Sequence, residues 1–145
     1  MEAPLPISYY IPGDRVWFRN PDDASSDVAG FEGSWVFYLG GGQFSNFWQR
    51  NKPFTLAAKC VDVYQWRNGT ALDANGELQM DEERVEQLVD ATMTQAAEVE
   101  CITQRMFRLR DPQGVYAQGG CMDTSRESPR WVRPETTDIV LPGMY

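Results

Sequence analysis

Residues 34–48 decide the fold. The sequence reads SWVFYL over Ser34–Leu39, GGG over Gly40–Gly42 and QFSNFW over Gln43–Trp48. Aromatic and β-branched residues favour pleated strands, and glycine supplies the positive φ angles that tight hairpin turns need. We therefore expect Ser34–Leu39 and Gln43–Trp48 to pair as an antiparallel hairpin.

The aromatic residues extend this β-rich region in both directions along the chain. Fourteen of the 18 aromatic side chains lie between Tyr9 and Trp66, and large rings contribute much of the burial energy of a core. Before the hairpin, Arg15–Arg19 reads as a short strand. After it, Phe54–Trp66 reads as a long extended segment with Cys60 in its middle. The pattern predicts an aromatic β-rich part over residues 8–67.

A single amphipathic helix is predicted over residues 81–98. Asp81 can cap its N-terminus, and apolar residues recur at helical spacing from Val85 to Ala96. Residues 100–145 are expected to form an irregular segment and three short strands, Cys101–Leu109, Val115–Ala117 and Asp138–Leu141. The order of elements predicts one α+β domain over residues 1–145, with an antiparallel, partly barrel-like sheet and one main amphipathic helix on it.

Charge and length narrow the function classes. The 145 residues carry a net charge of −8, which repels a phosphate backbone, so we expect no nucleic-acid partner. No apolar run approaches the roughly 20 residues that span a bilayer, so no membrane association is expected. The protein is expected to be cytoplasmic, or exported without a conventional signal peptide. A protein partner, which could be basic, fits this surface best.

The chain has three cysteines, Cys60, Cys101 and Cys121, and no histidine. Their spacing matches no metal signature, so we expect no metal site, and no motif indicates a cofactor. Cys121 follows two glycines and has Asp123 nearby, so this pair is the catalytic candidate in the sequence. The alternative for all three cysteines is that they are reduced structural thiols.

Two segments resemble a known family. The runs YIPGDRVWFRNPD over Tyr10–Asp22 and FEGSWVFYLG over Phe31–Gly40 are similar to the C-terminal half of the spore-type bacterial protein-glutamine γ-glutamyltransferases. These enzymes belong to the papain-like, NlpC-type superfamily of cysteine enzymes. The similarity covers about residues 8–48 and implies their architecture and, in an intact member, acyl transfer through a cysteine.

The resemblance also implies that the catalytic positions are missing. In the family a nucleophilic cysteine precedes these segments, and no cysteine precedes Tyr10 here. The catalytic glutamate of the family falls on Ser34, and its histidine, expected near Phe44–Phe47, is absent. Because a thiol with a pKa of about 8.5 needs a base or a positive neighbour to become reactive, these losses argue against unaided catalysis.

The sequence therefore predicts a catalytically degenerate transglutaminase-like domain that acts as a protein-recognition or regulatory module. Its binding candidates are the aromatic side chains of the hairpin, with core packing as the alternative for each of them: Trp35, Phe44, Phe47 and Trp48. The alternative function is a protein-glutamine γ-glutamyltransferase or deamidase, such as a bacterial effector, whose catalytic residues come from another segment or chain. A third hypothesis is that the chain is the C-terminal piece of a longer polypeptide.

Overall fold

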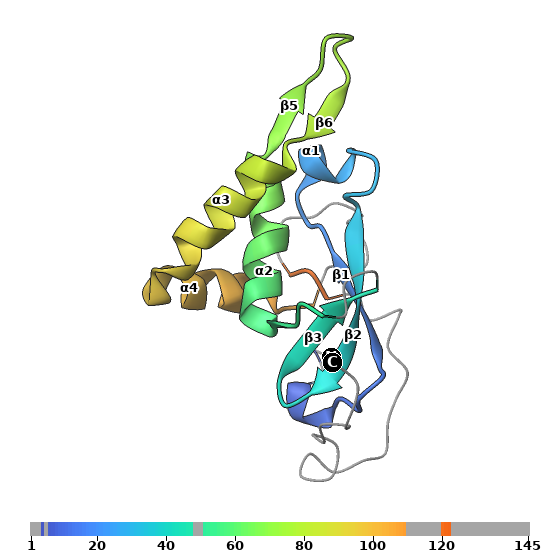
Figure 1. The fold of residues 1–145 in the computed structure, drawn as a ribbon, viewed down its shortest axis with the longest axis vertical. Coiled ribbons are helices and arrows are strands. Elements are labelled where there is room, and N and C mark those ends of the chain that lie inside the picture. Colours follow the sequence, from blue (N-terminus) through green and yellow to red (C-terminus); the bar gives the residue numbers. More distant parts are fainter. Residues whose placement is uncertain (1–3, 5, 48–50, 110–119, 123–145) are drawn as a thin grey trace.

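The computed structural model describes residue 4 and residues 6–47, 51–109 and 120–122. A four-stranded sheet packs against a layer of helices, and a small hairpin projects beyond them (Figure 1). The elements are η1 (Ile7–Tyr9), β1 (Arg15–Arg19), α1 (Asp23–Ser26), β2 (Gly33–Gly40), β3 (Gln43–Asn46), β4 (Phe54–Thr55), α2 (Leu56–Gln65), η2 (Trp66–Asn68), β5 (Thr70–Leu72), β6 (Leu78–Met80), α3 (Glu82–Met93) and α4 (Ala96–Met106).

The central hairpin is confirmed. Strands β2 and β3 pair in antiparallel fashion, with Tyr38 opposite Phe44. Gly40 at the end of β2 and the turn residues Gly41 and Gly42 have φ angles of 98°, 61° and 79°, a region that L side chains rarely adopt. The glycine run therefore fixes the turn.

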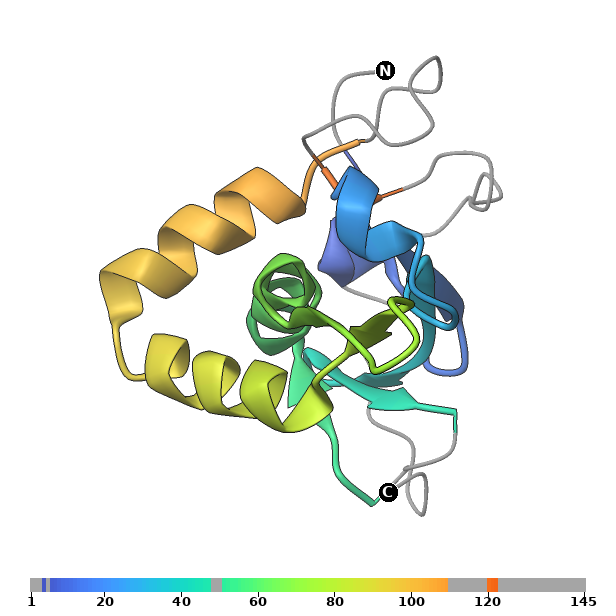
Figure 2. The same ribbon diagram turned by 90° about the horizontal axis from the view of Figure 1, so that it is seen from above.

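The α+β class is confirmed, but the barrel-like closure is wrong. In the described part of the chain, the sheet has the open order β1-β2-β3-β4, and β5 pairs only with β6 in a separate hairpin. Strand β4 has only two residues, too few to extend the sheet toward closure. Helices cover one face of the sheet instead, as the view from above shows (Figure 2).

The extended segment predicted over Phe54–Trp66 is wrong, because most of it is helix α2. Thr55 caps this helix by accepting a hydrogen bond from the Ala58 N–H at 3.1 Å. The helix lies between the sheet and the other helices, so it buries residues on several sides, including Cys60, Val61 and Val63. A helix that is buried all round lacks a one-sided apolar pattern, and its β-branched residues then resemble a strand.

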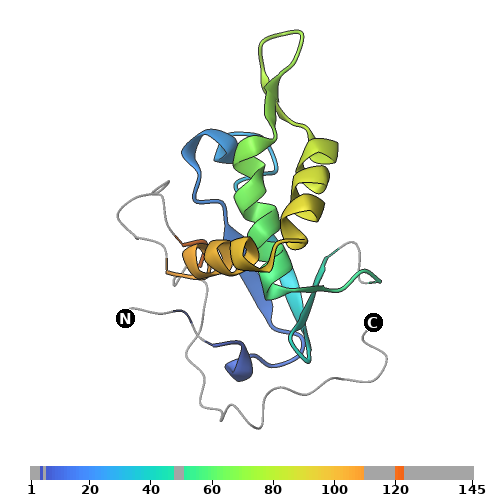
Figure 3. The same ribbon diagram turned by 90° about the vertical axis from the view of Figure 1, so that its left-hand side faces the viewer.

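The helix predicted over residues 81–98 is in fact two helices. Asp81 accepts a hydrogen bond from the Arg84 N–H at 3.1 Å, as expected of its cap. Helix α3 ends at Met93, and α4 begins at Ala96 and crosses α2 (Figure 3). The predicted strand Cys101–Leu109 is therefore mainly helical.

Residues 120–122 return to the sheet and complete the core beside β1. Met122 forms isolated bridges with Phe18 and with Leu109. Cys121 and Met122 belong to the same buried cluster as the aromatic residues of the sheet and the inner face of α2. The strands predicted at Val115–Ala117 and Asp138–Leu141 lie outside the described residues.

Candidate functional site

A groove of about 1050 Å³ lies where β2 begins and β3 ends, between these strands and the helices α2 and α3. The strands contribute residues from both faces of the sheet, because the groove lies at the ends of the strands. Helix α2 contributes Ala58, Lys59 and Asp62, and α3 contributes Glu82, Val85 and Glu86. This is the size of cavity that holds a small ligand or a few side chains of a partner.

Aromatic rings form the apolar part of the groove: Trp17, Phe31, Trp35, Phe47, Phe54 and Trp66. The rings of Trp17 and Trp35 lie 5.1 Å apart. The absence of a side chain at Gly33 makes room for Trp17, because a Cβ atom there would overlap the indole ring. Rings held in this way offer contact area that loses little conformational entropy on binding.

Charged residues in the groove are mainly acidic. The charged lining residues are Glu32, Asp62, Glu82, Glu86, Lys52 and Lys59. Four carboxylates therefore face two ammonium groups, and these two are the only lysines in the whole chain. Glu32, Glu82 and Glu86 are exposed, so the rim carries negative charge toward solvent.

Among the described residues that line the groove, Lys59 is the one charged side chain that is buried. Its ammonium donates to Asn46 Oδ1 at 3.4 Å, lies 3.5 Å from Asp62 Oδ2 and sits 5.3 Å above the Phe54 ring. Burial lowers the pKa of Lys59, and the neighbouring Asp62 carboxylate opposes this shift. The ammonium is thus held in place at the base of the groove.

Two of the four predicted binding residues line the groove. Trp35 is half-buried and Phe47 is exposed, and both are lining residues. Phe44 is different, because it is completely buried with its ring among Tyr38, Phe18 and other core rings. For Phe44 the alternative of core packing therefore applies. Trp48 lies outside the described residues.

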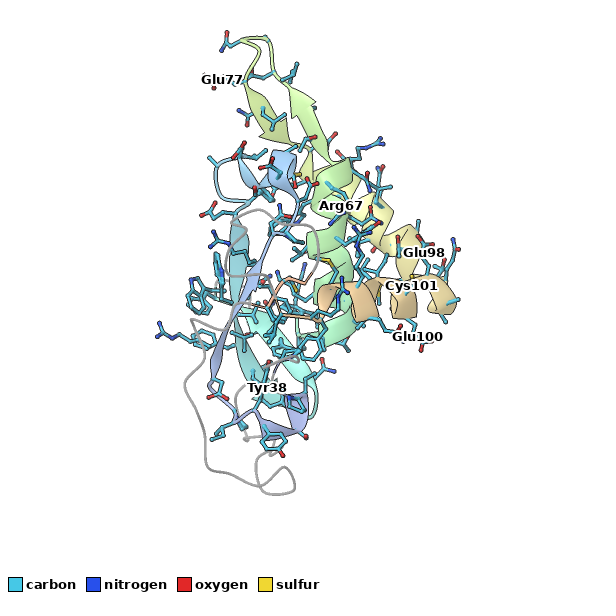
Figure 4. The ribbon with its side chains drawn as sticks, turned by 180° about the vertical axis from the view of Figure 1, so that it is seen from behind. Tyr38, Arg67, Glu77, Glu98, Glu100 and Cys101 are labelled. Carbon is cyan, nitrogen blue, oxygen red and sulfur yellow. The ribbon has the colours of Figure 1, made fainter. Side chains whose placement is uncertain are left out.

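The three cysteines are not among the described residues that line the groove. Cys60 and Cys121 are completely buried, and neither is a lining residue. A hydrogen bond with Cys60 and burial raise the pKa of the Cys121 thiol well above its usual value. Cys101 is exposed on the outer side of α4 (Figure 4). Asp123, the other catalytic candidate, lies outside the described residues.

Comparison with known families identifies the architecture. The model of the family described as protein-glutamine gamma-glutamyltransferase matches residues 3–140, which is most of the chain. The chain belongs to the protein-glutamine gamma-glutamyltransferase family. No curated protein and no solved structure gives a significant match.

The glutamate and histidine positions that the resemblance assigned to catalysis in the transglutaminase family lie in or next to the groove. Ser34, which stands at the glutamate position, is a lining residue, and so are Asn46 and Phe47 from the region expected to hold the histidine. The side chains that these positions offer here are a hydroxyl, an amide and a phenyl ring. None of these is a general base of ordinary strength.

The charged residues of α2 and α3 in this transglutaminase-family chain were not predicted as site residues from the sequence. Lys59 and Asp62 lie three residues apart and pair on one side of a helix, whereas a strand would place them on opposite faces. A usable signal was present in the composition, since only two lysines occur in 145 residues and both lie within Lys52–Lys59.

Metal ligands do not gather in the described part of the chain. Among residues 4, 6–47, 51–109 and 120–122, no three cysteine or acidic side chains are placed to hold a metal ion. No helix in the same ranges has the length and apolar character to cross a membrane.

Proposed function

We propose that this chain is a catalytically degenerate transglutaminase-like domain that recognises a protein partner through the groove between β2, β3, α2 and α3. The observation that carries the proposal is the lining itself. Among the described residues, it combines six aromatic rings with an acidic rim and includes none of the three thiols. The chain also has no histidine, so the family's usual proton carrier is missing.

The partner that fits this groove is a basic protein segment. Ring surfaces take up apolar side chains and the stems of lysine and arginine, and arginine also stacks on aromatic faces. The exposed carboxylates of Glu32, Glu82 and Glu86 then lie near the bound cations. Such complementarity raises the association rate and disfavours acidic partners.

A peptide-display selection on the purified chain tests this proposal. We expect enriched peptides to carry lysine or arginine next to an apolar residue. Titration calorimetry with an enriched peptide should show that Trp35→Ala weakens binding about 30-fold, in the range of an aromatic hot spot. The matched control is Leu72→Ala, because Leu72 is an exposed apolar residue on β5, outside the groove lining.

Two results would overturn the recognition proposal. One is a selection that enriches acidic peptides or none. The other is a Trp35→Ala variant that remains folded and binds as tightly as the Leu72→Ala control.

One contact favours the alternative function, an amidotransfer or deamidation enzyme. The positive charge of the Lys59 ammonium acts to lower the pKa of the Cys121 thiol and so favours its thiolate, which is the effect of a positive neighbour rather than of a base. Against this, Cys121 is buried and its pKa is raised. Ammonia release from a glutamine-containing protein, present with the wild-type chain and lost in Cys121→Ser, would establish the enzyme.

A further inference from the structure

Three different side chains meet at the base of the groove, and peptide recognition does not explain their combination. The Lys59 ammonium nitrogen lies 3.4 Å from Asn46 Oδ1 and 3.5 Å from Asp62 Oδ2. An amine, a primary amide and a carboxylate are therefore in contact. These groups are a nucleophile, an acyl group and a carrier for protons, which together are what the transfer of an acyl group to an amine requires.

The backbone holds the three groups in this arrangement. Asn46 lies two residues after Phe44 on β3, so both side chains point to the face of the sheet that the helices cover. Strand β3 pairs with β4, and α2 begins directly after β4. Lys59 and Asp62 lie three residues apart on one side of α2. Regular secondary structure on both sides thus fixes the distance between the amine and the amide.

The surroundings of Lys59 favour its neutral amine, which is the nucleophilic form. Lys59 is 5% exposed, and its nitrogen lies 5.3 Å above the Phe54 ring. Burial lowers the pKa of Lys59, whereas the charged neighbours Asp62 on the same helix and Cys121 beside β1 act in the opposite direction. Burial is the largest of these effects.

We propose that Lys59 and Asn46 react with each other to form an intramolecular isopeptide bond, with Asp62 as the carrier of the proton. The Lys59 nitrogen attacks Asn46 Cγ, the carbon bonded to the oxygen that it contacts. A Cγ–Nζ bond forms and the Cγ–Nδ2 bond breaks. Asp62 takes one proton from the attacking amine and gives it to the departing nitrogen, which leaves as ammonia. The reaction needs no oxidant and no co-reactant.

The protonation of Lys59 sets the rate of this reaction. An ammonium group has no lone pair, so a chain reacts only while Lys59 is neutral. The bond should therefore form slowly at neutral pH and faster as the pH rises, and freshly purified chain should still hold the free ammonium. The contact itself places the two groups close together, which replaces a collision between separate molecules. The reaction does not rest on the recognition proposal, because no partner takes part in it.

The isopeptide bond would join β3 to α2 across the base of the groove. It would close a short loop that contains β4. A cross-link of this kind restricts the unfolded chain as a disulfide does, so the cross-linked protein should melt at a temperature higher by on the order of 10 °C. The two sides of the groove would then be held at a fixed separation.

The test uses the full chain, incubated at mildly alkaline pH and then digested with trypsin. Cleavage after Arg50 separates Asn46 from Lys59 in a chain that has not reacted. In a chain that has reacted, we expect peptide 20–50 to remain joined to peptide 51–67, because trypsin does not cleave after a modified lysine. The mass of the joined species should be lower than the sum of the two peptides by one ammonia.

Variants assign the roles of the three side chains. Lys59→Gln and Asn46→Ala should form no joined species and show no rise in Tm on incubation. Asp62→Asn should form it at least about 10-fold more slowly, as expected when a proton carrier is removed. Asn75→Ala is the matched control, because Asn75 is an exposed asparagine outside the groove lining, and it should react like the wild-type chain.

The proposal fails if the wild-type chain yields only separate peptides after incubation. It also fails if ammonia is lost only at Asn68 or Asn75, which precede glycines and can close on their own backbone, or if Asn46 is joined to Lys52. Equal rates for Asp62→Asn and wild type would contradict the role of Asp62. The wild-type digest decides whether the bond forms, so that result does not depend on the folding of the variants.

Discussion

The two faces of the four-stranded sheet carry similar aromatic residues and differ in what covers them. On the face covered by helices, Phe18, Tyr38 and Phe44 are completely buried. On the opposite face, Trp17 packs on Trp35, and Phe37 stacks on Phe47 with ring centroids 4.1 Å apart. Strand alternation places both sets in the same short strands. Ring content alone therefore does not separate a core face from the opposite face of the same sheet; the neighbouring layer of helices does.

The largest expected effect compares Phe44 and Phe47, which lie three residues apart on either side of this boundary. Phe44→Ala removes a ring from the middle of the core and should lower the free energy of unfolding by about 3–5 kcal/mol. Phe47→Ala removes a ring that is 38% exposed and should cost less than about 1.5 kcal/mol. Urea denaturation followed by circular dichroism measures both values.

Equal losses for the two variants would contradict the assignment of the faces. In that case Phe47 would belong to a core that extends across the sheet. Binding separates the two variants further, because Phe47→Ala should weaken the binding of an enriched peptide and leave the fold intact.

The next effect concerns the charged wall of the groove. Glu82→Gln combined with Glu86→Gln should lower the affinity for a basic peptide by about 5-fold. Most of the loss should lie in the association rate, and the loss should be smaller at high salt. The control is Glu98→Gln combined with Glu100→Gln, which changes the net charge equally on the exposed side of α4 (Figure 4). Glu82 and Glu98 both lie in the first turn of a helix, so the dipole effects match.

The proposed contribution of the acidic rim to binding would be contradicted if both double variants lowered the affinity for the peptide to the same extent. That result would assign the effect to overall charge. Stopped-flow association rates at several salt concentrations separate the two cases.

The sheet could be predicted from the sequence because its signals are local. The glycine run Gly40–Gly42 fixes a turn whatever surrounds it. The start of helix α3 could be predicted for the same reason, because Asp81 caps the helix within its own first turn. The helices α2 and α4 could not be predicted in this way. Val61 and Val63 favour a strand by propensity, and only burial between two layers makes a helix the better solution. Tertiary packing therefore overrides local preference in the helical layer.

The candidate site was partly predictable for the same reason. Trp35 and Phe47 were found because they lie on the correctly predicted hairpin. Lys59 and Asp62 were missed because their pairing needs helical spacing, and that spacing was hidden by the wrong assignment of Phe54–Trp66. The hairpin side of the groove is thus predictable from local sequence signals, whereas the helical side depends on tertiary packing.

The smallest expected effect separates the polar base of the groove from its aromatic walls through pH. Burial places the pKa of Lys59 in the folded chain below its ordinary value of 10.5. Between the lowered pKa and 10.5 the unfolded chain binds more protons, so the wild-type chain gains stability as the pH rises through that range. Lys59→Met has no such gain, because methionine carries no titratable group. The free energy of unfolding of Lys59→Met relative to wild type should therefore be highest at neutral pH and fall toward pH 10.5. Urea denaturation at a series of pH values measures this difference. A constant or rising difference would contradict the prediction. It would mean that the ion pair with Asp62 outweighs the effect of burial on the pKa of Lys59, so that the ammonium at the base of the groove stays charged.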